Sequence, residues 1–224
     1  MKLRGGSSSR WLVAAVFAVL STTATSVAAE DFTARMQNDE GKTATRYVSQ
    51  KAVRQVSAYP VETDVIYRLD QGKIIRLDHK AKTYTEATPA AASQAFSGQS
   101  PGGGKLPPAL AAPTVTKVGA GQPILGYATD EYAIKSFMAH SQVWITTALA
   151  YPPGYSEMVA ASLPPPAKAM FIGNKVQGFA LKTVTTVNAA GGASTSEIAT
   201  AIDKGPIPPS TFEPPAGYKK VQAQ

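Results

Sequence analysis

The alternation of apolar and polar residues over 65–86, VIYRLDQGKIIRLDHKAKTYTE, is the feature that most limits the folds open to this chain. Tyr67 falls on one side of a strand and its neighbours fall on the other, because side chains alternate across a β-sheet. Gln71-Gly72 supplies a turn, and a returning strand follows over 73–78. A polar turn then leads into a third short strand at 83–85. The segment therefore predicts a three-stranded antiparallel meander.

The same period of two recurs along most of the chain and favours a mainly β fold with an antiparallel sheet. Only Tyr155–Leu163 has a helical signature, which begins near Ser156 and ends at Pro164. The further strands that the period predicts are 32–36, 43–48, 53–57, 114–118, 126–137, 141–148, 176–187 and 195–202.

Residues 1–29 have the pattern of a secretory signal peptide, with three basic residues before the apolar run Trp11–Leu20 and small residues up to a cleavage site after Ala29. The run is about half of the ~20 residues that a membrane-spanning helix needs. A lipid-anchored lipoprotein would need a cysteine at the cut, and the chain has none. We therefore expect a soluble periplasmic or secreted protein without a transmembrane anchor after cleavage.

The charge pattern argues against a nucleic-acid partner. Removal of residues 1–29 takes the formal net charge from +7 to +4, because three basic residues and no acidic residue are lost. A nucleic-acid binder is expected to concentrate basic residues in a stripe. Here basic and acidic residues are interleaved, as in Arg68-Leu69-Asp70.

One segment interrupts the strand pattern. Residues 88–113 consist mostly of alanine, glycine, proline and serine, a composition that buries too little apolar surface to offset its ordering entropy. We interpret 30–224 as a single β-rich domain in which 88–113 is a flexible insertion. A division into two domains is the alternative.

The residues that usually carry catalysis are scarce. The segment 98–106, GQSPGGGKL, fails the spacing of a phosphate-binding loop. His79 and His140 stand outside any cluster with metal-ligand spacing. The sequence thus predicts no catalytic residue, no metal site and no cofactor. An enzyme would become plausible only if a cleft gathered Glu62, Asp64 and a histidine.

Apolar and aromatic residues in the predicted strands offer one face for a core or for a ligand. Alternation alone reports burial, so a filled core is the simpler interpretation. The other interpretation is a partly empty apolar hollow, because the sequence predicts one helix to cover the sheet. Such hollows bind apolar ligands. The candidate ligand-binding residues are Tyr67, Leu69, Ile75, Leu77, Tyr84, Tyr132, Ile134, Trp144, Phe179 and Leu181.

Four segments together resemble a family of exported bacterial proteins known as domain of unknown function 4412. They are the segment 65–86, ILGYATDEYAI at 124–134, VWIT at 143–146 and IPPSTFEPPAGYKKV at 207–221. The resemblance implies a relative of the periplasmic lipoprotein carriers. Their fold is a curved antiparallel sheet forming a half-open β-barrel that holds acyl chains beneath one or a few short helices.

The resemblance assigns no catalytic residue. Many of these relatives place a cysteine where this chain has Thr129, so a disulfide or thiol role does not carry over. In the last segment, paired prolines stiffen an extended chain around Phe212. We expect Phe212 and Tyr218 to lock the C-terminus against the sheet.

Two functional hypotheses follow. The first is a non-catalytic exported binding protein that holds an apolar ligand, a lipid or lipoprotein acyl chain, on the concave face of the half-barrel. The alternative is a cell-envelope structural or protein-interaction module with a filled core and no small ligand. Its exposed edge strands would then pair with an envelope protein.

Overall fold

The structure is a computed structural model. It describes residues 30–59, 62–98, 112–137, 139–164, 167–168, 171, 176–188 and 192–222. The predicted signal peptide at 1–29 and the later part of the predicted insertion, 99–111, lie outside the described residues.

In the described part of the chain, twelve strands form one sheet in the order β12-β6-β5-β4-β3-β2-β1-β11-β10-β9-β8-β7. Neighbouring strands run antiparallel except β12 and β6, which run parallel. The strands are β1 Phe32–Asn38, β2 Thr43–Val48, β3 Ala52–Ser57, β4 Thr63–Arg68, β5 Lys73–Asp78, β6 Thr83–Ala87, β7 Thr114–Ile124, β8 Tyr127–Lys135, β9 Ala139–Thr146, β10 Phe179–Val187, β11 Ser194–Lys204 and β12 Lys219–Lys220.

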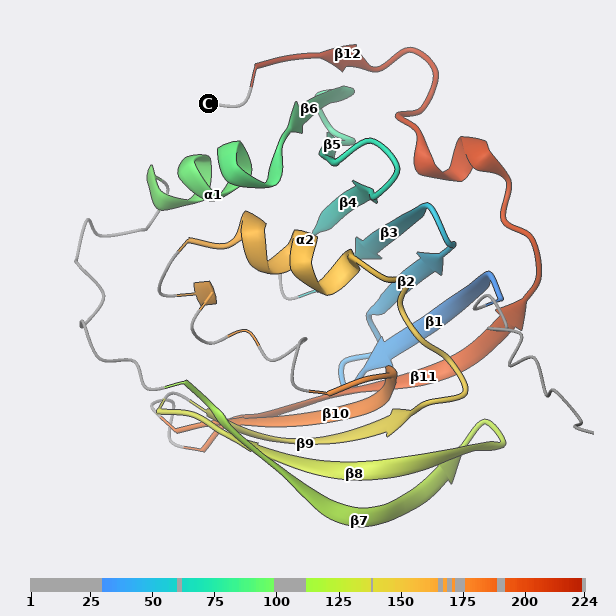
Figure 1. Cartoon of the computed structure of the whole chain (residues 1–224), viewed down its shortest axis with the longest axis vertical. Helices are drawn as coiled ribbons and strands as arrows, with labels where there is room; N and C mark the ends of the chain where they lie inside the picture. Colours follow the sequence, from blue (N-terminus) through green and yellow to red (C-terminus); the bar gives the residue numbers. More distant parts are fainter. Residues whose placement is uncertain are drawn as a thin grey trace, which may run out of the picture.

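The sheet curves around two helices but does not close. Figure 1 shows α1 (Pro89–Gly98) and α2 (Tyr155–Ser162) inside the curve, and the two helices pack against each other. The edge strands β7 and β12 do not pair with each other, so the barrel is open. The mainly β, half-open barrel expected from the sequence is confirmed. Across the described ranges, no helix combines the length and the apolar character needed to cross a membrane.

The sequence predicted a flexible insertion over 88–113, but the first part of this segment forms helix α1. Residues Pro89–Gly98 form this helix. Proline is at its first position, where the missing N–H would have no partner within the helix. The Thr88 hydroxyl accepts a hydrogen bond from the Ala91 amide (3.3 Å), as a helix cap does. The Ala92 side chain is buried against β4 and β5. Tertiary packing therefore orders a segment whose composition alone resembles a linker.

The main core lies on the inner face of the sheet, the face toward the helices. Phe179 of β10 is 1% exposed and meets Phe32 of β1 edge to face, with 5.1 Å between the ring centroids. Tyr151, in the loop before α2, packs on Phe179 at 5.4 Å. This contact joins the first half of the sheet, the second half and the helical layer.

A second core lies on the outer face, under the chain that follows β11. We call residues 205–222 the C-terminal strap; Figure 1 shows it running outside the sheet from β11 to β12. Its short 3₁₀ helix, Pro209–Phe212, buries Phe212 (5% exposed) against Ile66 and Ile75. The predicted anchoring of the C-terminus by Phe212 is confirmed.

Polar side chains under the strap complete its attachment. Asp64 accepts two hydrogen bonds from Arg54 (2.9 and 2.6 Å), and Arg54 also donates to the Thr211 carbonyl (2.9 Å). His79 bonds Asp64 through Nε2 (2.8 Å) and the Tyr218 hydroxyl through Nδ1 (2.6 Å). Tyr218 therefore anchors the strap as predicted. His79 and Asp64 meet here to hold the strap on the outer face.

Replacement of Tyr218 by phenylalanine is expected to lower the free energy of unfolding by about 0.5–1.5 kcal/mol, because one hydrogen bond to His79 is lost. Urea denaturation of the purified protein measures the change. Tyr84→Phe is the matched control, because Tyr84 packs in the same outer cluster and takes no part in the hydrogen bonds that join Asp64, His79 and Tyr218. Equal losses in the two variants would contradict an anchoring role for Tyr218.

Candidate functional site

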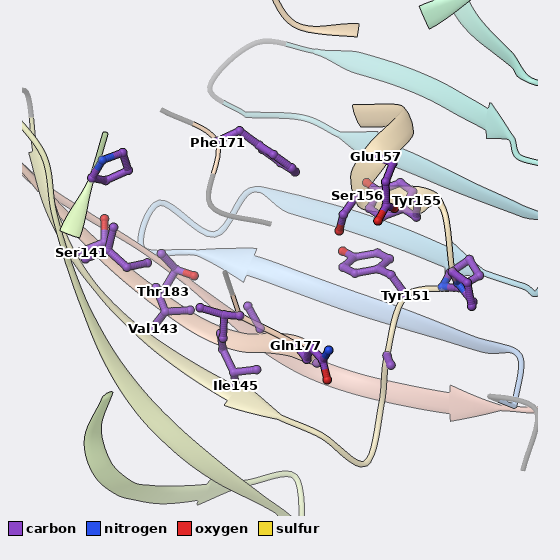
Figure 2. A pocket seen from close by; sticks show the side chains of 18 of the residues that line it. Ser141, Val143, Ile145, Tyr151, Tyr155, Ser156, Glu157, Phe171, Gln177 and Thr183 are labelled. Carbon is purple, nitrogen blue, oxygen red and sulfur yellow. The ribbon is translucent and has the colours of Figure 1, made fainter. Parts of the chain in front are cut away.

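A cavity of about 910 Å³ opens between α2 with its preceding loop and the inner face of β8, β9 and β10 (Figure 2). Its lining is mostly apolar and aromatic, with serine, threonine, glutamine and glutamate side chains among it. The lining residues include Ile134, Ser141, Val143, Ile145, Tyr151, Tyr155, Ala180 and Thr183.

The sheet wall of the cavity follows from strand register. Val143 on β9 pairs with Thr183 on β10 and with Tyr132 on β8, and Ile145 pairs with Ala180. Side chains directly opposite each other share a face, and alternate residues along one strand also do. These residues therefore form one continuous apolar wall, and Val143, Ile145 and Ile134 form a buried cluster there.

The opposite wall is the segment YPPGY at 151–155. Gly154 adopts φ +84°, a left-handed conformation that favours glycine, and this turn starts α2. The rings of Tyr151 and Tyr155 stack with centroids 4.4 Å apart, and Tyr155 meets Tyr67 edge to face at 5.3 Å. Gln55 donates a hydrogen bond to the Tyr155 hydroxyl (2.6 Å). The aromatic wall is therefore fixed by ring contacts and by a hydrogen bond.

Tyr151 and Tyr155 of this wall, and Tyr67 packed against Tyr155, are uncharged at physiological pH. Burial is the main cause that raises the pKa of Tyr67, of Tyr151 and of Tyr155 above the ordinary value for a phenol. The wall offers aromatic faces and neutral hydroxyl groups, which suit an apolar ligand.

A charged pair lies on the same inner face, on strands β2 and β11, which flank β1. Arg46 donates through Nη2 to both carboxylate oxygens of Glu197 (2.9 and 3.1 Å), and the Tyr59 hydroxyl donates to Glu197. Burial opposes the charge on Arg46, but nearby Tyr151 and Glu197 outweigh it and the pKa of Arg46 is raised. Among the described residues, its buried Nη1 has no hydrogen-bond partner.

The structure brings seven of the ten sequence-predicted residues into or around this region. Ile134 lines the cavity, and Tyr132 packs in the same cluster. The other five are buried in, or packed against, the main core: Tyr67, Leu69, Trp144, Phe179 and Leu181. Their role in ligand binding remains a prediction.

The prediction that all ten share one concave face is wrong for Ile75, Leu77 and Tyr84. Tyr67 pairs with Ile74, whereas Ile75 pairs with Ile66, so Ile75 lies on the outer face. Leu77 and Tyr84 pack there too, in the cluster that contains Phe212 of the strap. The C-terminal strap covers this apolar surface.

Trp144 packs against the main core but does not line the cavity. It stands between Val143 and Ile145 on β9, so alternation directs its ring away from the cavity. Trp144 pairs with Lys182 across the strands, and the Lys182 ammonium lies 4.5 Å from the centre of its ring. The ring is therefore engaged outside the cavity.

Sequence reasoning missed the residues that form most of the cavity. Val143, Ile145 and Ala180 are ordinary strand residues, and only the pairing of β8, β9 and β10 brings them together. Tyr151 and Tyr155 carried a signal, because two tyrosines flanking Pro-Pro-Gly mark a stiff turn that presents aromatic rings.

The fold and the cavity define a half-open β-barrel protein with a hollow beneath its helices. The chain belongs to the family described as domain of unknown function (DUF4412), whose model matches residues 22–218. The resemblance inferred from the sequence motifs is thereby confirmed. No curated protein matches the chain.

Solved structures with similar chains share little sequence with this protein. PNGF-II in its C2 crystal form has 14% identity and a TM-score of 0.49, covering 87% of this chain and 31% of PNGF-II. In its P21 form it has 13% identity and a TM-score of 0.48, covering 87% and 32%. A LolA superfamily protein from Nitrosomonas europaea has 6% identity and a TM-score of 0.28, covering 83% and 89%. This chain thus spans about a third of the length of PNGF-II.

Proposed function

We propose that this protein is a non-catalytic binding protein that holds the acyl chain of a lipid or lipoprotein in the cavity beneath α2. The observation that carries the proposal is the cavity of about 910 Å³ with its apolar sheet wall and aromatic opposite wall. Ligand sites in proteins typically measure about 300–1,000 Å³ and combine apolar walls with a few polar groups.

The proposed binding energy comes from removing the chain from water. Each buried methylene contributes about 0.8 kcal/mol, so two added methylenes strengthen binding by about tenfold while the cavity has room for them. The tyrosines of the opposite wall supply rigid apolar area, because their rings are already packed against one another. The affinity should therefore rise with chain length and then level off.

The proposed location is the periplasm or the extracellular space, on the strength of the signal-peptide pattern in residues 1–29. An acyl chain in that compartment is shielded from water only by a membrane or by a protein. A binding protein with an apolar hollow suits that need.

The substitution Ala180→Phe tests the site, because it places a ring in the cavity from its sheet wall. We expect it to weaken displacement of a fluorescent fatty acid by about tenfold or more. Ala133→Phe is the matched control, since Ala133 neighbours Ile134 on β8 and points to the other face. The proposal fails if the unmodified protein yields no lipid by mass spectrometry and binds no fluorescent fatty acid.

The alternative of an envelope interaction module is favoured by one observation, the edge strand β7. Within the described residues it pairs with β8 alone, is mostly exposed, and carries Val118 with 60% of its surface exposed. An edge strand presents backbone groups that a partner strand can use. Crosslinking in intact cells from position 118 tests this function: a single recurrent protein partner, with no co-purifying lipid, would favour it over lipid binding.

A further inference from the structure

A second hollow, of about 370 Å³, lies beside the cavity between the β1–β2 turn and strands β10 and β11. We call it the polar hollow, because polar side chains line it. They include Asn38, Lys42, Tyr59, Thr183, Thr195 and Glu197.

The polar hollow adjoins the apolar cavity along β10. Thr183 lines both spaces. Ser141 of the cavity and Thr185 of the polar hollow are joined by a hydrogen bond between their hydroxyl groups (2.8 Å). Across β10 and β11, Thr183 pairs with Glu197, which places the two hollows on the same face of the sheet.

The charges around the polar hollow are paired within the protein. Lys42 lies 2.8 Å from Glu40, and Glu197 is held by Arg46 and Tyr59. An ionised head group placed here would lose water without gaining an uncompensated counter-charge, which is unfavourable. A hydroxyl-bearing head group would instead exchange its hydrogen bonds with water for bonds to threonine, asparagine and tyrosine side chains.

We infer that the ligand is a neutral amphipathic lipid whose polyol head group, glycerol or sugar, lies in the polar hollow while its acyl chain fills the cavity. This inference rests on the proposed function and specifies its ligand class. The step in polarity along β10, from Ala180 through Thr183 to Thr185, then sets the direction in which the ligand lies.

The test compares three probes with the same twelve-carbon chain, each below its critical micelle concentration: 1-monolauroylglycerol, dodecyl glucoside and dodecanoate at pH 8. We expect the two neutral polyol lipids to bind at least about tenfold more tightly than dodecanoate. The double variant Thr185→Val with Thr195→Val, two residues that line the polar hollow and not the cavity, should reduce this preference to less than about threefold and leave the affinity for dodecanoate unchanged. Thr45→Val, on the other face of β2, is the matched control.

Each outcome separates the inference from the proposed function. If dodecanoate binds as tightly as the neutral lipids, or if the double variant keeps their preference, the polar hollow does not select the head group and the inference is overturned. Acyl binding would stand in that case. If none of the three probes binds to the unmodified protein, both proposals fail. Binding of only one neutral lipid, at least about tenfold over dodecanoate, supports the inference and identifies the polyol.

Discussion

Replacement of Asp64 by alanine is expected to lower the free energy of unfolding by about 3–5 kcal/mol. The Asp64 side chain is 1% exposed and that of Arg54 is 15% exposed, so the substitution leaves the guanidinium charge enclosed without its carboxylate. The hydrogen bond to Asp64 is also the largest cause of the raised pKa of Arg54. His79 loses one of its two hydrogen-bond partners in the same step. Urea denaturation measures the loss.

Two further variants separate the enclosed pair from an ordinary surface pair. Asp203→Ala breaks the contact with Arg35, whose side chain and partner are both 58% exposed, and should cost about 0–1 kcal/mol. The double substitution Asp64→Leu with Arg54→Met removes both charges together and should recover much of the loss. A loss for Asp64→Ala no larger than that for Asp203→Ala would contradict the assignment.

The strands of this fold were predictable because the alternation of side chains is local. The meander over 65–86 becomes β4, β5 and β6, and the later strands fall where the same period occurs. β12 was not predictable, because it is two residues long and pairs in parallel with a strand far away in the sequence. Helix α1 was missed because its alanines suit a helix as well as a linker.

The faces of the strands were harder to assign than the strands themselves. Ile74 and Ile75 are adjacent on β5 and are 2% and 3% exposed, so both faces of this strand are buried. Alternation identifies the core face of a strand only when the other face is exposed to water. Here the C-terminal strap covers the other face, so both faces of β5 are apolar. The strap contacts β3 from more than a hundred residues further along the chain, a distance at which no local pattern gives a signal.

The cavity depended on the same kind of long-range arrangement. Its apolar wall comes from strand pairing among β8, β9 and β10, and its aromatic wall from a loop that returns over them. The sequence indicated that one helix would leave the sheet partly uncovered, which is the physical reason for a hollow. It did not locate that hollow in the second half of the chain.

Replacement of Phe179 by alanine is expected to cost about 3–5 kcal/mol, because it removes a ring that is 1% exposed from the centre of the main core. Phe179 contacts both Phe32 and Tyr151. The substitution therefore weakens the packing between the two halves of the sheet and also the support of the aromatic wall of the cavity. Denaturation measures the stability. Displacement of a fluorescent fatty acid should show weaker binding in the same variant under conditions in which it remains folded.

Phe137→Ala is the matched control, because the Phe137 side chain is 78% exposed and its loss should change stability by less than about 0.5 kcal/mol. Phe179→Leu keeps most of the buried volume and should cost less than the alanine substitution. If Phe179→Ala unfolds at the same urea concentration as Phe137→Ala, Phe179 does not join the two halves of the sheet. In that case Tyr151 would need other contacts to keep its place in the wall of the cavity.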